Sequence, residues 1–296
     1  MKKVMTYIRK TTNKIILILL GVFILVFLLV VGIGIFSVRY VLVPKSVEQS
    51  TEKDTLITAD DGIKLVASES IAPEATHKWA ILVHSYRTSR SFMEPYAKKY
   101  QEKGYNTLTP DNRAHGASGG KYIGMGYLDQ YDILRWIDYI LAKDSEAEII
   151  LHGVSMGGAA LMMLSGQGNI PKNVKAIVED CGYTSAKGYL AWKLKQKFGL
   201  PAFPVIPIAN IAFKISAGYY MEDASAMEGV KKSNVPILFI HGTEDMTVPV
   251  EDVYRLYEAA TCPKELYIAE GAGHGEALWI DENEYWNQVL SFIGDQ

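Results

Sequence analysis

The sequence predicts an α/β protein with a doubly wound, mostly parallel β-sheet, preceded by a transmembrane helix and interrupted by a small helical cap. Three observations predict this class. Continuous apolar runs alternate with helical periodicity along most of the chain. One N-terminal stretch is apolar enough to cross a bilayer, and an insertion rich in aromatic residues and proline separates two later runs. With 296 residues, of which 49% are hydrophobic, the chain can bury one large core.

The first element is a predicted transmembrane anchor at residues 15–38. As a helix rising ~1.5 Å per residue, this uncharged stretch would reach ~36 Å, which exceeds the ~30 Å hydrocarbon core of a bilayer. A secretory signal would have a shorter apolar stretch and a small-residue cleavage site, and residues 36–44 offer no good one. A soluble core helix is rarely apolar on every face. We therefore expect an uncleaved signal anchor.

Charge predicts the orientation of this anchor. Residues 1–14 hold five basic residues and no acidic one, whereas only Arg39 and Lys45 follow the anchor closely. This bias predicts a cytoplasmic N-terminus, a single pass through the cell membrane and a body on the outside. Residues 39–53 are a predicted linker. Because the whole chain carries −3, the part after residue 14 carries −8, which argues against nucleic acid as a partner.

The body, residues 54–296, begins with a predicted antiparallel hairpin, because two short alternating runs flank Asp61-Gly62. Continuous apolar runs then predict strands buried on both faces of a parallel sheet, at residues 78–85, 105–111, 147–153, 174–180, 235–242 and 264–271. Helical periodicity predicts helices at residues 91–104, 127–144, 156–166, 250–260 and 282–295. Ligands bind at the carboxyl ends of the strands in such sheets, so we searched there for candidate site residues.

Ser155 is the candidate nucleophile. It lies in Gly153-Val154-Ser155-Met156-Gly157, a G-x-S-x-G motif between a predicted strand and a predicted helix. A sharp strand-to-helix turn strains the serine backbone, and only glycine leaves room for the neighbouring strand and helix. The motif alone is weak evidence, since an ordinary glycine-rich turn can match it. Its position between strand and helix favours a nucleophile.

A serine hydroxyl needs a base and a carboxylate that orients the base. His274 follows the last predicted strand in a glycine-rich loop, which is where the base falls when the chain order is serine, acid, histidine. Asp245 is the favoured acid, with Glu244 as a solvated neighbour in the same loop. Asp180 ends another strand and is a rival for this role.

The developing oxyanion needs two backbone N–H donors. One is expected from Met156, the residue after the nucleophile. The second is expected from Tyr86, in the loop after the first buried run. No cofactor is predicted, and no metal, because the histidines, cysteines and carboxylates lack metal-ligand spacing. Cys181 and Cys262 are read as small buried residues, and a disulfide between them is not expected.

Over residues 56–293 the chain resembles the α/β-hydrolase superfamily, specifically bacterial serine hydrolases similar to serine aminopeptidases and small esterases. The resemblance rests on the motifs VHSYRTS, PDNRAHGASGG, LHGVSMGGAA, HGTEDMTVP and GAGHG. It implies Ser155 as nucleophile, Asp245 as acid and His274 as base, with oxyanion donors at Tyr86 and Met156. It also implies a loop that shapes the site without reacting, formed by Asp111, Arg113, His115 and Ser118. The family's usual His-Gly is His84-Ser85 here.

The resemblance also locates an insertion at about residues 185–232, longer than one crossover helix needs. We interpret it as a cap over the active site whose apolar side chains favour an acyl or aromatic substrate group. The alternative is that they only pack on the core, and contact with lipid is open to them too. The residues concerned are Trp192, Phe198, Phe203, Ile206 and Phe213.

The sequence therefore predicts a membrane-anchored serine hydrolase of carboxylesterase type. Its expected substrate is a small-molecule or lipid-like ester or thioester with an apolar acyl group, cleaved through an acyl-enzyme. A peptidase or amidase and an acyltransferase are alternatives within the same triad chemistry. A catalytically silent hydrolase fold that binds a cell-surface partner is the alternative of another class. The oligomeric state is not predicted.

Overall fold

The computed structural model describes residues 2–44 and 49–294, and in these residues the sheet has eight strands. Their order is β1-β2-β4-β3-β5-β6-β7-β8; β1, β2 and β4 pair antiparallel, and the remaining pairs are parallel. The strands are β1 (Thr55–Thr58), β2 (Lys64–Ser70), β3 (Lys78–Val83), β4 (Asn106–Pro110), β5 (Glu148–Val154), β6 (Val174–Asp180), β7 (Ile237–Gly242) and β8 (Lys264–Ala269). The predicted hairpin and mostly parallel sheet are confirmed.

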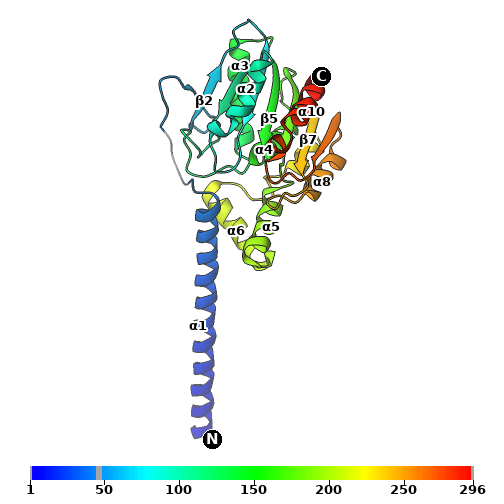
Figure 1. Cartoon of the computed structure of the whole chain (residues 1–296). Helices are drawn as coiled ribbons and strands as arrows, with labels where there is room; N and C mark the ends of the chain where they lie inside the picture. The colour runs from blue at the N-terminus through cyan, green and yellow to red at the C-terminus, as the bar shows by residue number, and fades with distance from the viewer. Residues whose placement is uncertain (1, 45–48, 295–296) are drawn as a thin grey trace.

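Helices cover both faces of this sheet (Figure 1). Successive strand residues point to opposite faces: Ile81 and Val83 belong to one apolar cluster, Ala80 and Leu82 to the other. The first face carries α3 (Asp129–Lys143), α4 (Met156–Ser165) and α8 (Glu251–Ala259). The second carries α2 (Glu94–Glu102), α9 (Ala277–Ile280) and α10 (Glu282–Gly294). The doubly wound class is therefore confirmed; residue 295, the predicted end of the last helix, lies outside the described residues.

The N-terminal helix α1 (Lys2–Val41) extends away from the body as one long rod (Figure 1). Its segment Arg9–Val41 contains an 18-residue window with a mean hydropathy of 3.5 and is, within the described residues, the one helix long and apolar enough to cross a membrane. These properties are compatible with a membrane anchor or a signal sequence. In the predicted linker, residues 39–41 are helical and residues 45–48 lie outside the described part of the chain.

The end of α1 packs against the body through α6 (Ala202–Ala217). Gly34, Val38 and Leu42 are buried and lie four residues apart, so they share one side of α1. A Cβ added to Gly34 would lie 3.3 Å from the Cβ of Ala212 in α6. The glycine therefore lets the two helices approach closely.

The insertion between β6 and β7 forms three helices, α5 (Ala186–Phe198), α6 (Ala202–Ala217) and α7 (Ala226–Val230). Figure 1 shows α5 and α6 beside the body end of α1, on the side of the body from which α1 extends. Ile206 and Phe213 are buried, whereas Phe198 and Phe203 are exposed and Trp192 is half-buried. The apolar residues predicted for the cap thus face in two directions, partly inward and partly outward.

Candidate active site

Ser155 lies at the sharp turn between β5 and α4, as its motif predicts. Its backbone has φ 55° and ψ −112°, a conformation that non-glycine residues rarely adopt. A Cβ on Gly157 would lie 2.1 Å from the carbonyl oxygen of Val83, and one on Gly153 would lie 2.5 Å from the carbonyl carbon of Gly157. Backbone fills both spaces, so glycine at these two positions is a steric requirement of the turn.

Ser155, His274 and Asp245 form a continuous hydrogen-bonded chain. The Asp245 carboxylate accepts from His274 Nδ1 at 2.6 Å, which leaves His274 Nε2 to accept from the Ser155 hydroxyl at 2.8 Å. The three residues come from the ends of β5 and β8 and from the loop after β7, which lie at one edge of the sheet. The structure therefore brings together the three residues predicted as nucleophile, base and acid.

The loop after β7 holds Asp245 in its charged form. Its Oδ1 accepts from the backbone N–H groups of Thr247 and Val248, and its Oδ2 also lies 3.2 Å from His241 Nε2. Burial acts to raise the pKa of Asp245, but the hydrogen bonds from His241 and His274 outweigh it and hold this pKa below its ordinary value. An ionised carboxylate fixes the His274 tautomer that a serine nucleophile requires.

The two other candidate acids lie elsewhere. Glu244 is exposed. Asp180 is buried and accepts from the hydroxyl of Tyr285 at 3.0 Å, and burial raises the pKa of Asp180 to about 6. The Tyr285 hydroxyl also lies 2.9 Å from His152 Nε2, so Asp180 belongs to a buried network behind the strand ends. This geometry favours Asp245 as the partner of His274.

The two predicted oxyanion donors differ in how they are held. Met156 is the first residue of α4, so its N–H has no partner within the helix. Tyr86 lies in the loop after β3, and the backbone N–H of the next residue, Arg87, donates to His115 Nε2 at 3.0 Å. His115 belongs to the loop that the superfamily resemblance implies as the one that shapes the site. Its ring holds the Tyr86 loop in place through this hydrogen bond.

The side chains of the Tyr86 loop contact the end of α1, which the sequence did not predict. The Tyr86 hydroxyl donates to the carbonyl of Val41 at 2.7 Å, and the Arg87 guanidinium donates to the carbonyl of Tyr40. Helices leave their last carbonyls without intrahelical partners, so these two side chains cap α1. The candidate oxyanion loop and the N-terminal helix are thereby joined directly.

One group of possible metal ligands lies beside Ser155. Among the described residues, Cys181, Asp245 and His274 offer three ligand atoms within 4.8 Å of one another. Two of the three are already hydrogen-bonded to each other, and burial raises the pKa of the Cys181 thiol, which disfavours the thiolate that binds metals. Cys181 and Cys262 are both free. The arrangement fits acid–base chemistry better than a metal centre.

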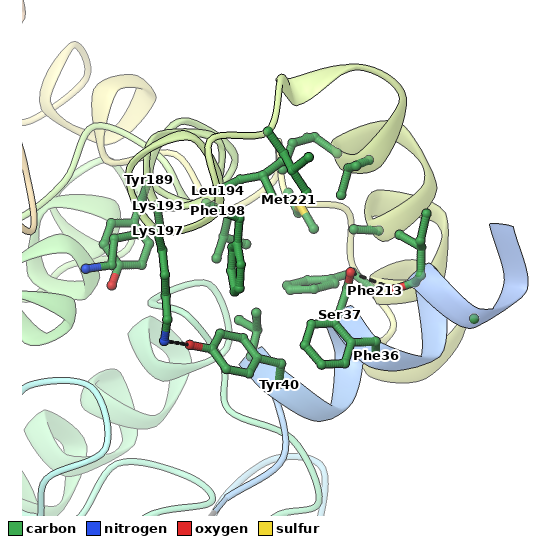
Figure 2. Close-up of a pocket in the computed structure, with 18 of the residues that line it drawn as sticks. Phe36, Ser37, Tyr40, Tyr189, Lys193, Leu194, Lys197, Phe198, Phe213 and Met221 are labelled. Carbon is green, nitrogen blue, oxygen red and sulfur yellow. Dashed lines mark hydrogen bonds between the residues drawn. The ribbon is translucent and has the colours of Figure 1, made fainter. Parts of the chain in front are cut away.

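A cavity of about 550 Å³ lies between α1, the cap and the Tyr86 loop (Figure 2). Its lining is mostly apolar and includes Tyr86 and Tyr189, whereas Ser155, Asp245 and His274 do not line it. Burial and the nearby Asp245 carboxylate together raise the pKa of Tyr189 to about 12. The sequence reasoning missed the contribution of α1 to this cavity, because all of residues 15–38 are uncharged and mostly apolar, and nothing in the sequence separates the side that faces the cap.

Comparison with known proteins agrees with this fold. The sequence model of the prolyl oligopeptidase family matches residues 90–295. The uncharacterized protein YqkD of Bacillus subtilis is 30% identical over 224 residues, which cover 75% of this chain and 73% of YqkD. The Pyrococcus furiosus esterase Pf2001 superposes with a TM-score of 0.70 at 24% identity, covering 86% of this chain and 97% of its own. Est1E of Butyrivibrio proteoclasticus, with ferulic acid bound, gives 0.58 at 20% identity, covering 80% and 99%.

Proposed function

This chain belongs to the prolyl oligopeptidase family and is an esterase-like α/β hydrolase, and from that premise we propose that it is a membrane-anchored serine hydrolase acting on esters or thioesters with an apolar acyl group. The observation that carries the proposal is the hydrogen-bonded chain from Ser155 through His274 to Asp245. Serine, base and acid are the groups that acyl transfer requires, and they lie within contact distance of one another.

In the proposed reaction, Ser155 Oγ attacks the carbonyl carbon of the ester while its proton passes to His274 Nε2. The N–H groups of Tyr86 and Met156 stabilise the oxyanion; removal of one such donor typically costs about 3 kcal/mol. Collapse of the tetrahedral intermediate breaks the ester bond, and the leaving alcohol takes the proton from His274. Water then attacks the acyl-enzyme, giving its proton to His274, and the carboxylic acid is released as Ser155 regains its proton.

The cavity beneath the cap supports an apolar acyl group as the part of the substrate that is recognised. Its volume of about 550 Å³ lies within the ~300–1,000 Å³ range of small-molecule sites. A peptide is the second candidate substrate, because the family is named for an oligopeptidase. Acyl transfer is an alternative reaction that would proceed through the same acyl-enzyme. A peptide's amides would lose hydrogen bonds to water in a mostly apolar cavity, which makes an acyl chain the better occupant.

The direct test is to label Ser155. The full chain, purified in detergent micelles, is treated with a fluorophosphonate probe and with p-nitrophenyl esters of increasing acyl length, beside peptide p-nitroanilides. We expect labelling of the wild type, ester turnover that exceeds amide turnover, and loss of both labelling and turnover in Ser155→Ala. The matched control is Ser165→Ala, since Ser165 lies at the other end of α4 and its hydroxyl donates to the Met162 carbonyl. A folded wild type that neither labels nor turns over any ester contradicts the proposal.

The proposed location is the cell membrane, with residues 15–38 of α1 as the anchor, residues 1–14 in the cytoplasm and the catalytic body outside. The five basic residues before residue 15 support this orientation. Protease added to intact cells should digest the body and leave the N-terminal end protected. A body that is cut only after the cells are opened contradicts the orientation.

A further inference from the structure

The cavity beneath the cap has α1 itself as one wall. Leu28, Gly32, Phe36 and Tyr40 all line it, and their four-residue spacing places them on one side of the helix. From Leu28 to Tyr40 this side extends ~18 Å along the helix axis. The cavity therefore starts in the middle of the proposed anchor and ends at the Tyr86 loop, where Tyr86 and the end of α1 are hydrogen-bonded.

The opposite wall comes from the cap. In Figure 2, Tyr189, Lys193, Leu194, Lys197 and Phe198 of α5 lie across the cavity from Phe36 and Tyr40 of α1. The wall is apolar apart from its lysines, and Lys197 Nζ donates to the hydroxyl of Tyr40 at 2.5 Å. The space between α1 and α5 thus suits an elongated apolar group, and the lysines of α5 provide positive charge beside it.

The charge of the cap contrasts with that of the whole chain. The cap at residues 185–232 contains seven lysines and three acidic residues, a net charge of +4, although the whole chain carries −3. Lys193 and Lys197 line the cavity. Together with Lys195 they make no ion pair to any described residue, because each salt bridge within the described part of the chain uses other groups. Of these three, Lys193 and Lys197 are the cations that an anionic group in this cavity can meet.

The cap also carries large apolar side chains that are exposed. The exposed fractions are 77% for Phe203, 59% for Ile211, 80% for Ile215 and 46% for Leu200. Large exposed apolar groups that lie together are typical of surfaces that meet a membrane or a partner. Because α6 packs against the body end of the proposed anchor, we expect this part of the cap to lie near the bilayer surface.

We propose that the cavity between α1 and the cap takes the acyl chain of an anionic membrane lipid directly from the bilayer and presents its ester to Ser155. The proposal rests on the proposed serine hydrolase function. The chain enters between Leu28 and the cap, lies along Gly32 and Phe36, and brings its carbonyl to the Tyr86 loop. Lys193 and Lys197 attract the anionic headgroup because their charge is opposite to that of the headgroup. The anchor is then a part of the substrate site as well as a tether.

Gly32 provides the test of the acyl-chain path. A Cβ at Gly32 meets nothing within 4 Å and Gly32 lines the cavity, so we expect the side chain of Gly32→Trp to enter the cavity. Gly21→Trp is the matched control, because a Cβ at Gly21 also meets nothing within 4 Å and Gly21 does not line the cavity. Gly21 lies eleven residues earlier, which is about three helical turns away on the same side of α1. The full chain is reconstituted in phosphatidylglycerol vesicles, and fatty-acid release is compared with turnover of the short ester p-nitrophenyl butyrate.

We expect Gly32→Trp to lower the ratio of fatty-acid release to short-ester turnover about tenfold, because about two methylenes of the acyl chain would lose their buried contacts. We expect Gly21→Trp to leave this ratio within twofold of the wild-type value. An unchanged ratio in Gly32→Trp, with an unchanged unfolding midpoint, overturns the acyl-chain path. Wild type that cleaves the short ester but releases no fatty acid from vesicles also overturns it and leaves the proposed function standing. Wild type that neither cleaves the short ester nor labels with fluorophosphonate overturns the proposed function itself.

A separate experiment tests whether the lipid headgroup is anionic, by changing the charge of the lipid and of the two lysines that line the cavity. We expect wild type to release fatty acid several times faster from phosphatidylglycerol than from phosphatidylcholine vesicles, and the pair Lys193→Gln and Lys197→Gln to remove this preference. The control is Lys98→Gln, an exposed lysine on α2. Equal rates on both lipids in wild type, or a preference that survives in the double variant, overturn the assignment of an anionic headgroup.

Discussion

The catalytic end of the sheet and the cavity beneath the cap are built in different ways. The candidate triad comes from loops that follow β5, β7 and β8, and backbone contacts around Gly153 and Gly157 fix its geometry. The cavity instead joins residues 28–41 of α1 to residues 189–221 of the cap, two segments far apart in the chain. The difference separates the candidate reacting groups, whose geometry depends on the ends of the sheet, from the proposed acyl-chain site, which depends on helix packing. The two meet at the Tyr86 loop.

Asp245→Asn should show the largest effect and should be confined to the catalytic end. An amide at this position favours the wrong His274 tautomer, and the same change in a serine protease triad lowers kcat about 10⁴-fold. We expect a similar loss for every ester, whatever its acyl length, measured as kcat in detergent micelles. Glu244→Gln, in the same loop but exposed, is the control and should stay within twofold. A loss that grows with acyl length would mean that triad and cavity are not separate.

The catalytic end could be predicted from sequence because its constraints are local. A glycine that would place a Cβ 2.1 Å from a neighbouring backbone oxygen has no tolerated replacement, so the G-x-S-x-G motif around Ser155 specifies the turn. His274 and Asp245 follow from chain order at strand ends. The contact of Tyr86 with Val41 could not be predicted, because it depends on where two distant segments meet in space. The outward exposure of Phe203 could not be predicted either, since aromatic residues in an insertion suit burial and membrane contact equally.

Asp180→Asn tests how much the buried network behind the catalytic end depends on pH. Burial raises the pKa of Asp180 to about 6, above its ordinary value of ~3.9. A carboxyl whose pKa is raised on folding favours the folded state when protonated, so its contribution is present below pH ~4 and is lost as pH rises through about 6. Two pKa units correspond to about 3 kcal/mol. We therefore expect wild type to lose stability between pH 4 and 7, and Asp180→Asn to flatten this dependence.

The measurement is the thermal unfolding midpoint of both proteins in detergent micelles from pH 4 to 7. Asp138→Asn is the control, because Asp138 is exposed on α3 and its pair with Arg135 is in contact with solvent. A pH dependence that is identical in wild type and Asp180→Asn would assign the effect to other groups. The kcat of Asp180→Asn should fall by less than tenfold, in contrast to Asp245→Asn, because Asp180 bonds Tyr285 and not His274.

Gly34→Ile should act on the cavity and not on the catalytic end. A larger side chain at this position meets Ala212, whose Cβ already lies 3.3 Å from a Cβ placed on Gly34, so it pushes α1 away from α6. We expect the preference for long over short p-nitrophenyl esters to fall about fivefold, which is about 1 kcal/mol, the contribution of roughly one buried methylene. Gly21→Ile, where the side chain meets no other part of the protein, should keep the preference. Retention of the preference by Gly34→Ile would show that substrate choice is independent of helix packing.

Tyr86→Phe acts at the point where the two regions meet and should have the smallest effect. The change removes the hydroxyl that donates to the carbonyl of Val41 at 2.7 Å but keeps the backbone N–H proposed for the oxyanion. Loss of one such hydrogen bond costs about 1 kcal/mol, which corresponds to about 2–4 °C in the unfolding midpoint of a domain of this size. Tyr254→Phe, on an exposed part of α8, is the control. We expect the midpoint to fall by that amount and kcat on a short ester by less than tenfold. A hundredfold loss of kcat with an unchanged midpoint would place the hydroxyl in the chemistry, and the end of α1 would then belong to the catalytic site.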